Sequence, residues 1–125
     1  MGIDGLSKID YNQGVGFDDT VMTMYAIAFD LDTETLTKTY PSPSYNNAYA
    51  DIRNKLSAHG FTWQQGSVYF GSEKVNAVSC VIAVVDLTQS FSWFAPSVRD
   101  IRMLRIEEQN DLRPAIEQSL QSNGK

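Results

Sequence analysis

The apolar stretch "MYAIAFDL", residues 24–31, constrains the possible folds most, because apolar side chains stand at odd and even positions alike up to Phe29. A strand with apolar side chains on both faces lies inside its sheet rather than at an edge. The stretch runs into two acids, Asp30 and Asp32, and burying an unpaired carboxylate is costly. We therefore expect a central strand whose acidic end is a catalytic site, a metal site or a solvated strand end.

A helix and a hairpin are predicted to follow this strand. Ser44 can cap a helix over 44–59, in which apolar residues recur every three or four positions. The pair Gln65-Gly66 is typical of a tight turn, so the segment 61–70 is expected to form two short strands.

A second helix, a loop and a last strand are predicted after the hairpin. The helix is expected over roughly 73–87 because four apolar residues form one stripe, namely Val75, Val78, Ile82 and Val85. The segment 93–96 is expected to be a loop and 97–106 a strand. Cys80 lies off the stripe, and we interpret it as a small buried filler without chemistry.

The predicted elements follow the order strand, helix, strand, strand, helix, strand. This is the split βαβ pattern of the ferredoxin-like fold, an α+β fold with a four-stranded antiparallel sheet and two helices on one face. The other face is left open, and self-association is the usual way to cover it. We expect a flexible extension over 1–23, a ferredoxin-like domain over 24–112 and a helical or polar tail over 113–125.

Composition excludes several classes of protein. No apolar run approaches the roughly 20 residues that span a bilayer, so no membrane partner is expected. The single cysteine, Cys80, rules out an internal disulfide and favours a reducing, cytoplasmic location. His59 is the only histidine, so a two-histidine acid–base pair cannot form within one chain. The net charge of −5 comes from the flanks, since residues 24–106 carry seven acids and seven bases.

Four stretches of the chain resemble the virulence-associated protein D (VapD) family. They are "MYAIAFDLD" in the first strand, "YNNAYADIRNKLSAHGF" in the first helix, "QGSVY" in the hairpin and "SVRDIRMLRIEEQNDL" in the last strand. The stretches occur at spacings that agree with the ferredoxin-like order and extend over nearly three quarters of the chain.

The resemblance implies a ferredoxin-like homodimer, similar to the small nuclease-like subunit of the CRISPR spacer-acquisition complex. Members of the family are described as endoribonucleases, and some are toxins of toxin–antitoxin pairs. An RNA substrate and an antitoxin protein are therefore the expected partners. The alternative is a dimeric interaction module whose nuclease residues are vestigial.

The resemblance also suggests site residues at the end of the first strand. Asp30 matches the acid of the family's "AFDL" and is the first candidate for catalysis. In a dimer two copies of Asp30 would come near each other, and such a pair favours a bound Mg²⁺ or one raised pKa. Asp32 has no clear counterpart in the family and is interpreted as a solvated loop acid. Ser67 follows Gly66, so a hydroxyl and backbone amides are available to a phosphate, although a plain turn serine is an equal alternative.

The last predicted strand carries an unusual number of charges: Arg99, Asp100, Arg102 and Arg105. An arginine there can hold a phosphate and stabilise its transition state, with Asp100 orienting the arginine as a further site residue. Alternation places Asp100 and Arg102 on one face and the other two arginines on the opposite face. A set of salt bridges on an edge strand is a close alternative. Tyr69 is a candidate for stacking on an RNA base.

Overall fold

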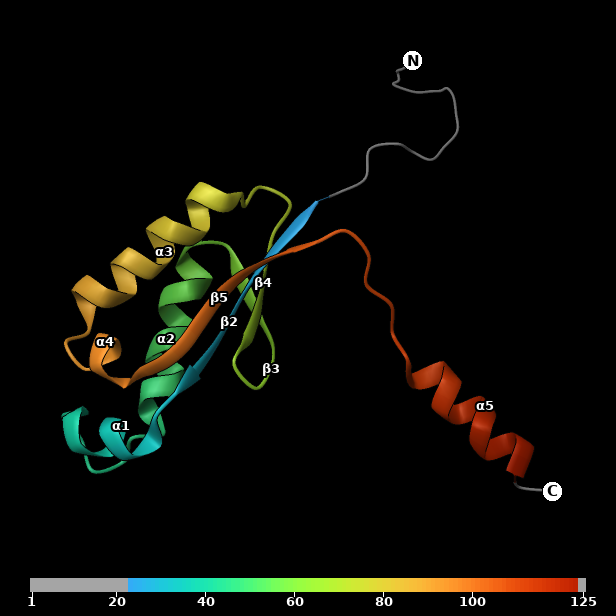
Figure 1. The fold of residues 1–125 in the computed structure, drawn as a ribbon, viewed down its shortest axis with the longest axis horizontal. Coiled ribbons are helices and arrows are strands. Elements are labelled where there is room, and N and C mark those ends of the chain that lie inside the picture. The colour runs from blue at the N-terminus through green and yellow to red at the C-terminus, as the bar shows by residue number, and fades with distance from the viewer. Residues whose placement is uncertain (1–22, 124–125) are drawn as a thin grey trace, which may run out of the picture.

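The computed structural model describes residues 23–123, so the predicted extension over 1–23 lies almost wholly outside the described residues. The described chain runs through four strands and five helices (Figure 1). In chain order these are β2 (Met24–Leu31), α1 (Thr33–Thr39), α2 (Asn47–Ala58), β3 (Phe61–Gln65), β4 (Val68–Gly71), α3 (Ala77–Ser90), α4 (Phe94–Ser97), β5 (Val98–Ile106) and α5 (Arg113–Asn123).

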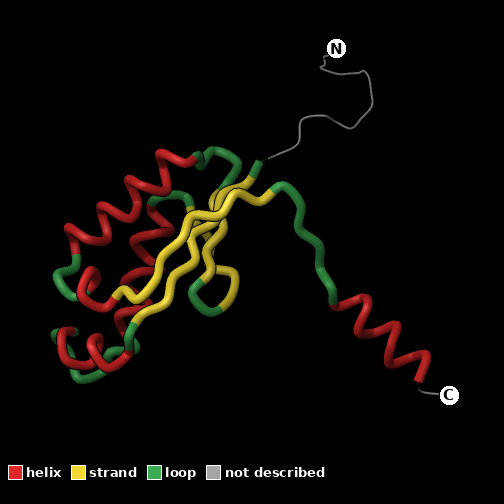
Figure 2. The backbone as a smooth tube through the Cα atoms, viewed as in Figure 1, coloured by secondary structure: helices red, strands yellow, loops and turns green. Residues whose placement is uncertain are grey.

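The four strands form one antiparallel sheet in the order β3-β4-β2-β5, so the predicted central strand is confirmed. α2 and α3 lie side by side on one face of this sheet (Figure 2). This is the topology of the ferredoxin-like fold, and the prediction of that fold from the order of the elements is confirmed. Within residues 23–123 no helix combines the length and the apolarity needed to cross a bilayer.

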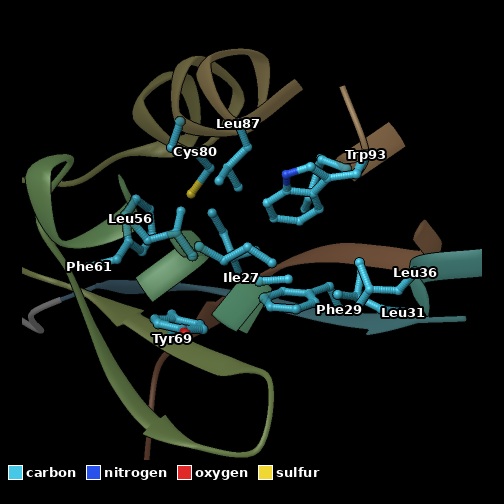
Figure 3. Close-up of a cluster of buried hydrophobic side chains, with 14 of the residues drawn as sticks. Ile27, Phe29, Leu31, Leu36, Leu56, Phe61, Tyr69, Cys80, Leu87 and Trp93 are labelled. Atoms are coloured by element: carbon cyan, nitrogen blue, oxygen red, sulfur yellow. The ribbon is translucent and has the colours of Figure 1, made fainter. Parts of the chain in front are cut away.

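The hydrophobic core lies between the sheet and the two covering helices (Figure 3). Ile27 and Phe29 of β2 point into it, and Tyr69 of β4 stacks on Phe29 with ring centroids 6.0 Å apart. Because side chains alternate along a strand, Ala28 and Asp30 point to the opposite face. We call this second face, which α2 and α3 do not cover, the open face.

The second helix differs from its prediction in both its start and its buried face. It begins at Ala77 behind an Asn76 cap, and Val75 instead packs in the preceding turn. The predicted stripe is exposed on the helix, whereas the residues that face the sheet are Cys80, Ala83 and Leu87. α3 carries apolar residues on most of its circumference, so periodicity alone cannot tell the two stripes apart. The smaller residues face the sheet, where the helix packs closely, and the expectation of a buried Cys80 is confirmed.

Two short helices were not predicted: α1 lies in a segment for which no helix was expected, and α4 lies in the segment expected to be a loop. α1 follows β2 directly, with Asp32 as its N-cap residue and the pair Glu34–Lys38 one turn apart at 3.6 Å. α4 takes the place of the expected loop around Trp93, whose indole packs edge-on against Tyr40 at 5.1 Å. Both helices are fixed by contacts between distant parts of the chain.

Smaller differences concern the first helix and the hairpin turn. α2 begins at Asn47 rather than just after Ser44. The hairpin is confirmed, but its two turn residues are Gly66 and Ser67, one position later than predicted. Gly66 has a φ of +52°, a conformation that glycine adopts without steric cost.

Candidate functional site

Asp30 lies at the exposed end of the central strand, on the open face. Its neighbours Phe29 and Leu31 are buried, whereas the Asp30 side chain is 59% exposed. The register places Asp100 of β5 directly opposite Asp30. Two like charges in cross-strand contact destabilise a sheet unless cations accompany them. The sheet therefore presents a pair of carboxylates that requires nearby positive charge.

Arg99 supplies part of this charge through a β-bulge. The register shifts between Asp30 and Leu31, so Arg99 is an extra residue on β5. Its guanidinium reaches two acids, with Nη1 3.6 Å from Asp30 Oδ2 and Nη2 3.6 Å from Asp32 Oδ1. A bulge re-aims a side chain in this way. Simple alternation, which was the basis of the prediction for Arg99, does not anticipate it.

Asp32, which was expected to be a solvated loop acid, occupies the N-cap position of α1 with its side chain 38% exposed and without a capping hydrogen bond to a helix amide. It precedes α1 and its Oδ2 accepts a hydrogen bond of 2.6 Å from the Thr35 hydroxyl. This hydrogen bond, together with the charge of Arg99, lowers the pKa of the Asp32 carboxyl. The local role explains why an acid stands two residues after Asp30 without implying that both act in one reaction.

Arg102 supplies a second positive charge on the open face. Its Nε donates to both carboxylate oxygens of Asp100 at 3.2 Å, which fixes the orientation of the guanidinium. Alternation predicted that these two residues share a face, and the register confirms it. Arg105 stands opposite Tyr25, five residues along the strand from Asp30 or roughly 17 Å, and pairs with Glu107 at 3.5 Å. Arg105 therefore lies apart from Asp30, Asp100 and Arg102.

The hairpin turn approaches the same end of the sheet. The Phe29 amide donates to the Ser67 carbonyl at 3.1 Å, so Ser67 lies beside the residue that precedes Asp30. Ser67 is half-buried. Its carbonyl is occupied by this hydrogen bond, which leaves the hydroxyl and the following amides as possible phosphate contacts.

The aromatic residue that sequence analysis selected is not the accessible one. Tyr69 is only 2% exposed, because its ring stacks on Phe29 inside the core, so it offers no face to an RNA base. Trp63, which stands opposite Tyr69 in the register, is 42% exposed. The Arg53 guanidinium lies 4.1 Å from the centroid of the Trp63 ring, and the Trp63 indole donates to the Gly66 carbonyl at 2.8 Å. Trp63 shares the helix-covered face with Tyr69, so alternation along β3 alone would have predicted that it is buried; it is accessible because β3 is the edge strand.

Tyr49 of α2 is a further residue near the end of β2, and its side chain is partly buried against the core. Burial raises the pKa of its phenol first, and the nearby Tyr45 and the negative charge of Asp30 raise it further. Tyr49 therefore lies within electrostatic range of Asp30. The connection from the end of β2 to the start of α2 could have suggested this, because it returns the chain to the same end of the sheet.

The carboxylates of one chain do not form a complete Mg²⁺ site. Across residues 23–123 no three of the His, Cys, Asp and Glu side chains gather closely enough to hold a metal ion. Asp30 and Asp32 are moreover both paired with the cationic Arg99, at 3.6 Å each. We therefore derive no chemical step through a metal.

The site can thus be described as four charged side chains at the exposed end of β2 and β5: Asp30, Arg99, Asp100 and Arg102. We call this set the charged cluster. Guanidinium groups bind phosphate oxygens in bidentate geometry, and an exposed carboxylate can accept a proton. This combination is suited to a phosphodiester, with Ser67 in the neighbouring turn, whereas Trp63 lies on the other face of the sheet.

Comparison with known proteins places this geometry in context. The family model described as CRISPR associated protein Cas2 matches residues 22–113. Endoribonuclease VapD 2 of Riemerella anatipestifer is 50% identical over 93 residues, which cover 74% of this chain and 99% of that protein. An endoribonuclease VapD homolog of Helicobacter pylori is 53% identical over 93 residues, covering 74% of this chain and 96% of that protein. Endoribonuclease VapD of Haemophilus influenzae is 34% identical over the same share of this chain and 98% of its own length.

Proposed function

The chain belongs to the VapD family and also matches the Cas2 family model, and from this premise we propose that it is an endoribonuclease acting at the charged cluster. The relatives named above are endoribonucleases by name. The observation that carries the proposal for this site is the cross-strand pair of Asp30 and Asp100 with an arginine beside each acid.

In the proposed reaction Arg102 holds a non-bridging oxygen of the scissile phosphate. Asp100 keeps the guanidinium in place through its two hydrogen bonds, so little reorganisation is needed as charge develops on the phosphorus oxygens. Asp30 accepts the proton of the attacking hydroxyl, and Arg99 binds a second phosphate oxygen from the other side of Asp30. The hydroxyl oxygen forms the new P–O bond as the bond to the leaving ribose oxygen breaks, and the leaving oxygen takes up a proton from water.

We further propose that the active form is a homodimer built on the open face. Apolar side chains share this face with Asp30, among them Val68 and Phe70 of β4 and Leu104 of β5. Leu104 is 45% exposed in the single chain. A second copy packed here would remove this apolar surface from water and bring a second charged cluster close to the first.

The proposal of catalysis by Asp30 is tested by Asp30→Asn in the purified full chain. The exchange keeps the size of the side chain and removes the base, so cleavage of a single-stranded RNA should fall about 10²- to 10⁴-fold. Asp111→Asn is the matched control, because Asp111 is an exposed acid outside the cluster. Equal activity of Asp30→Asn and the wild type, at equal thermal stability, would contradict the proposal.

The same pair of variants bears on two finer expectations. A toxin role with an antitoxin partner stays a prediction, under which induced wild-type protein arrests growth in cells and Asp30→Asn does not.

The rival function is a non-catalytic dimeric interaction module. Its support is that Asp30, Asp32 and Asp100 each have an ion-pair partner within the chain, as a purely structural set would. Absence of RNA cleavage by wild-type protein would favour this rival. The expected cytoplasmic location is likewise a prediction.

A further inference from the structure

The C-terminal helix presents an apolar stripe that no other part of residues 23–123 covers. Ile116 and Leu120 share one side of α5, and Leu112, four residues before Ile116, directly precedes the helix. Leu112, Ile116 and Leu120 are 72%, 60% and 66% exposed. A helix of 11 residues is marginal in water on its own, and a partner surface is what stabilises such a helix in a protein. α5 therefore needs an apolar surface to pack against.

A complementary stripe lies on the outer side of α3. It consists of the four aliphatic residues Val78, Val81, Ile82 and Val85, which follow the spacing of a helix–helix contact and are 45–65% exposed. Beside this stripe an apolar groove of about 240 Å³ runs between α3 and β5. The groove is lined by Val81, Val85 and Met103, among others. We call these residues of α3, together with the groove, the α3 surface.

Charge also favours contact between α5 and the α3 surface. The segment 107–123 carries four acids and one base. Arg105 of β5 lies on the helix side of the sheet, since it stands opposite Tyr25, whereas Asp86 is the only charged residue in the sequence of α3. An acidic helix segment would thus lie against the arginine-bearing edge of the sheet, which contributes to the choice of partner.

The path of the chain indicates that the surface used belongs to another copy. α5 lies on the other side of the sheet from α2 and α3, and the segment 107–112 leads away from β5 (Figure 1). Reaching its own α3 surface would require this short segment to reverse and cross the edge strand. The α3 surface of a second copy is not subject to this limit, because no short segment of chain ties it to α5.

We infer that α5 of one copy packs on the α3 surface of a second copy, and reciprocally. Such an exchange is closed and two-fold symmetric, because each chain carries one stripe of each kind. The family model ends at residue 113, where α5 begins, so the contact belongs to a part of the chain beyond the family match. The inference concerns assembly and does not depend on the proposed catalysis.

Disulfide trapping in the full chain tests the contact directly. One copy carries Ile82→Cys and a differently tagged copy carries Ile116→Cys, each at the centre of its stripe, so proximity is expected for either helix direction. Mild oxidation of the mixture should give a disulfide between the two tags. Gln118→Cys is the matched control, because it faces away from the α5 stripe and should not be trapped. The native thiol of Cys80 is buried, so it should form no intermolecular disulfide in the wild type.

Two further measurements decide between the outcomes. A single chain carrying both Ile82→Cys and Ile116→Cys should form disulfide-linked dimers, and an intramolecular disulfide in a monomer would overturn the exchange. Ile116→Gln/Leu120→Gln should weaken self-association in sedimentation about tenfold or more, because two apolar anchors are lost. Unchanged association of this variant, or trapping of Gln118→Cys as efficient as that of Ile116→Cys, would also overturn the inference.

Discussion

His59 follows the last residue of α2 and contacts Asp86 of α3. Both side chains are partly buried. His59 Nε2 lies 2.7 Å from Asp86 Oδ2, the Ser90 hydroxyl donates to Asp86 Oδ1 at 2.9 Å, and Lys55 Nζ is 3.9 Å away. The hydrogen bond with His59, then that from Ser90, and the nearby positive charge lower the pKa of Asp86. The only histidine of the chain therefore serves in the packing of α2 against α3, and it lies outside the charged cluster.

The lowered pKa of Asp86 predicts how stability depends on pH. A carboxyl whose folded pKa is depressed stabilises the fold above its unfolded pKa of about 3.9, and this contribution is lost as the pH falls through the folded pKa. Asp86→Asn should therefore lower the free energy of unfolding at pH 7, and its difference from the wild type should shrink towards pH 3. Urea unfolding at both pH values measures this. The exposed-acid control Glu73→Gln should stay within about 0.5 kcal/mol of the wild type, and an Asp86→Asn deficit equal at both pH values would contradict the prediction.

Individual residues of the candidate site were predictable to different degrees. Asp30 follows from local pattern, because an acid after an apolar run must stand at an exposed strand end. The pairing of Asp100 with Arg102 follows from alternation along one strand. The contact of Arg99 with Asp30 could not be predicted, since it depends on a bulge that is defined only when two strands distant in sequence pair. The same holds for Tyr69, whose burial is decided by the helix that packs above it.

At the scale of single elements, α3 shows where a periodic pattern reaches its limit. Two apolar stripes run along this helix, and the one with the larger residues was predicted to face the core. The opposite side is buried, because Ala83 and Cys80 allow the helix to approach the sheet closely. The turn before α3 is equally tight, since a methyl group added at Gly71 would lie 2.7 Å from a Val75 methyl carbon. Such fit depends on the three-dimensional packing and leaves little trace in periodicity.

The orientation of α3 is tested by a pair of truncations on its two sides. Leu87→Ala removes a fully buried side chain and should lower the free energy of unfolding by about 2–5 kcal/mol. Val78→Ala removes a side chain that is 65% exposed and should cost about 0.5 kcal/mol or less. Denaturant unfolding at low protein concentration measures both without a contribution from self-association. The reverse order of the two costs would mean that the predicted stripe is the buried one.

For the whole molecule, the order of elements was enough to predict the topology. One central apolar strand and a βαββαβ order within about 85 residues leave the ferredoxin-like sheet as the arrangement with short, right-handed connections. α1 and α4 were missed because both are short and are held by contacts such as that of Tyr40 with Trp93, which join segments more than 50 residues apart. The topology in turn explains the charged cluster, since pairing the first and last strands brings Asp30 next to Asp100.

The last prediction concerns the open face as the dimer interface. Leu104 stands opposite Ala26 on this face, and Leu104→Glu places a charge where the second copy would bury an apolar side chain. Self-association should weaken about tenfold or more, as measured by analytical ultracentrifugation over micromolar concentrations. Leu104→Ile keeps an apolar side chain at the same position and should associate like the wild type. RNA cleavage by Leu104→Glu should fall in parallel if the two charged clusters act together, although Asp30 is untouched. Wild-type protein that sediments as a monomer at micromolar concentration, or a Leu104→Glu variant that associates normally, would contradict an open-face dimer.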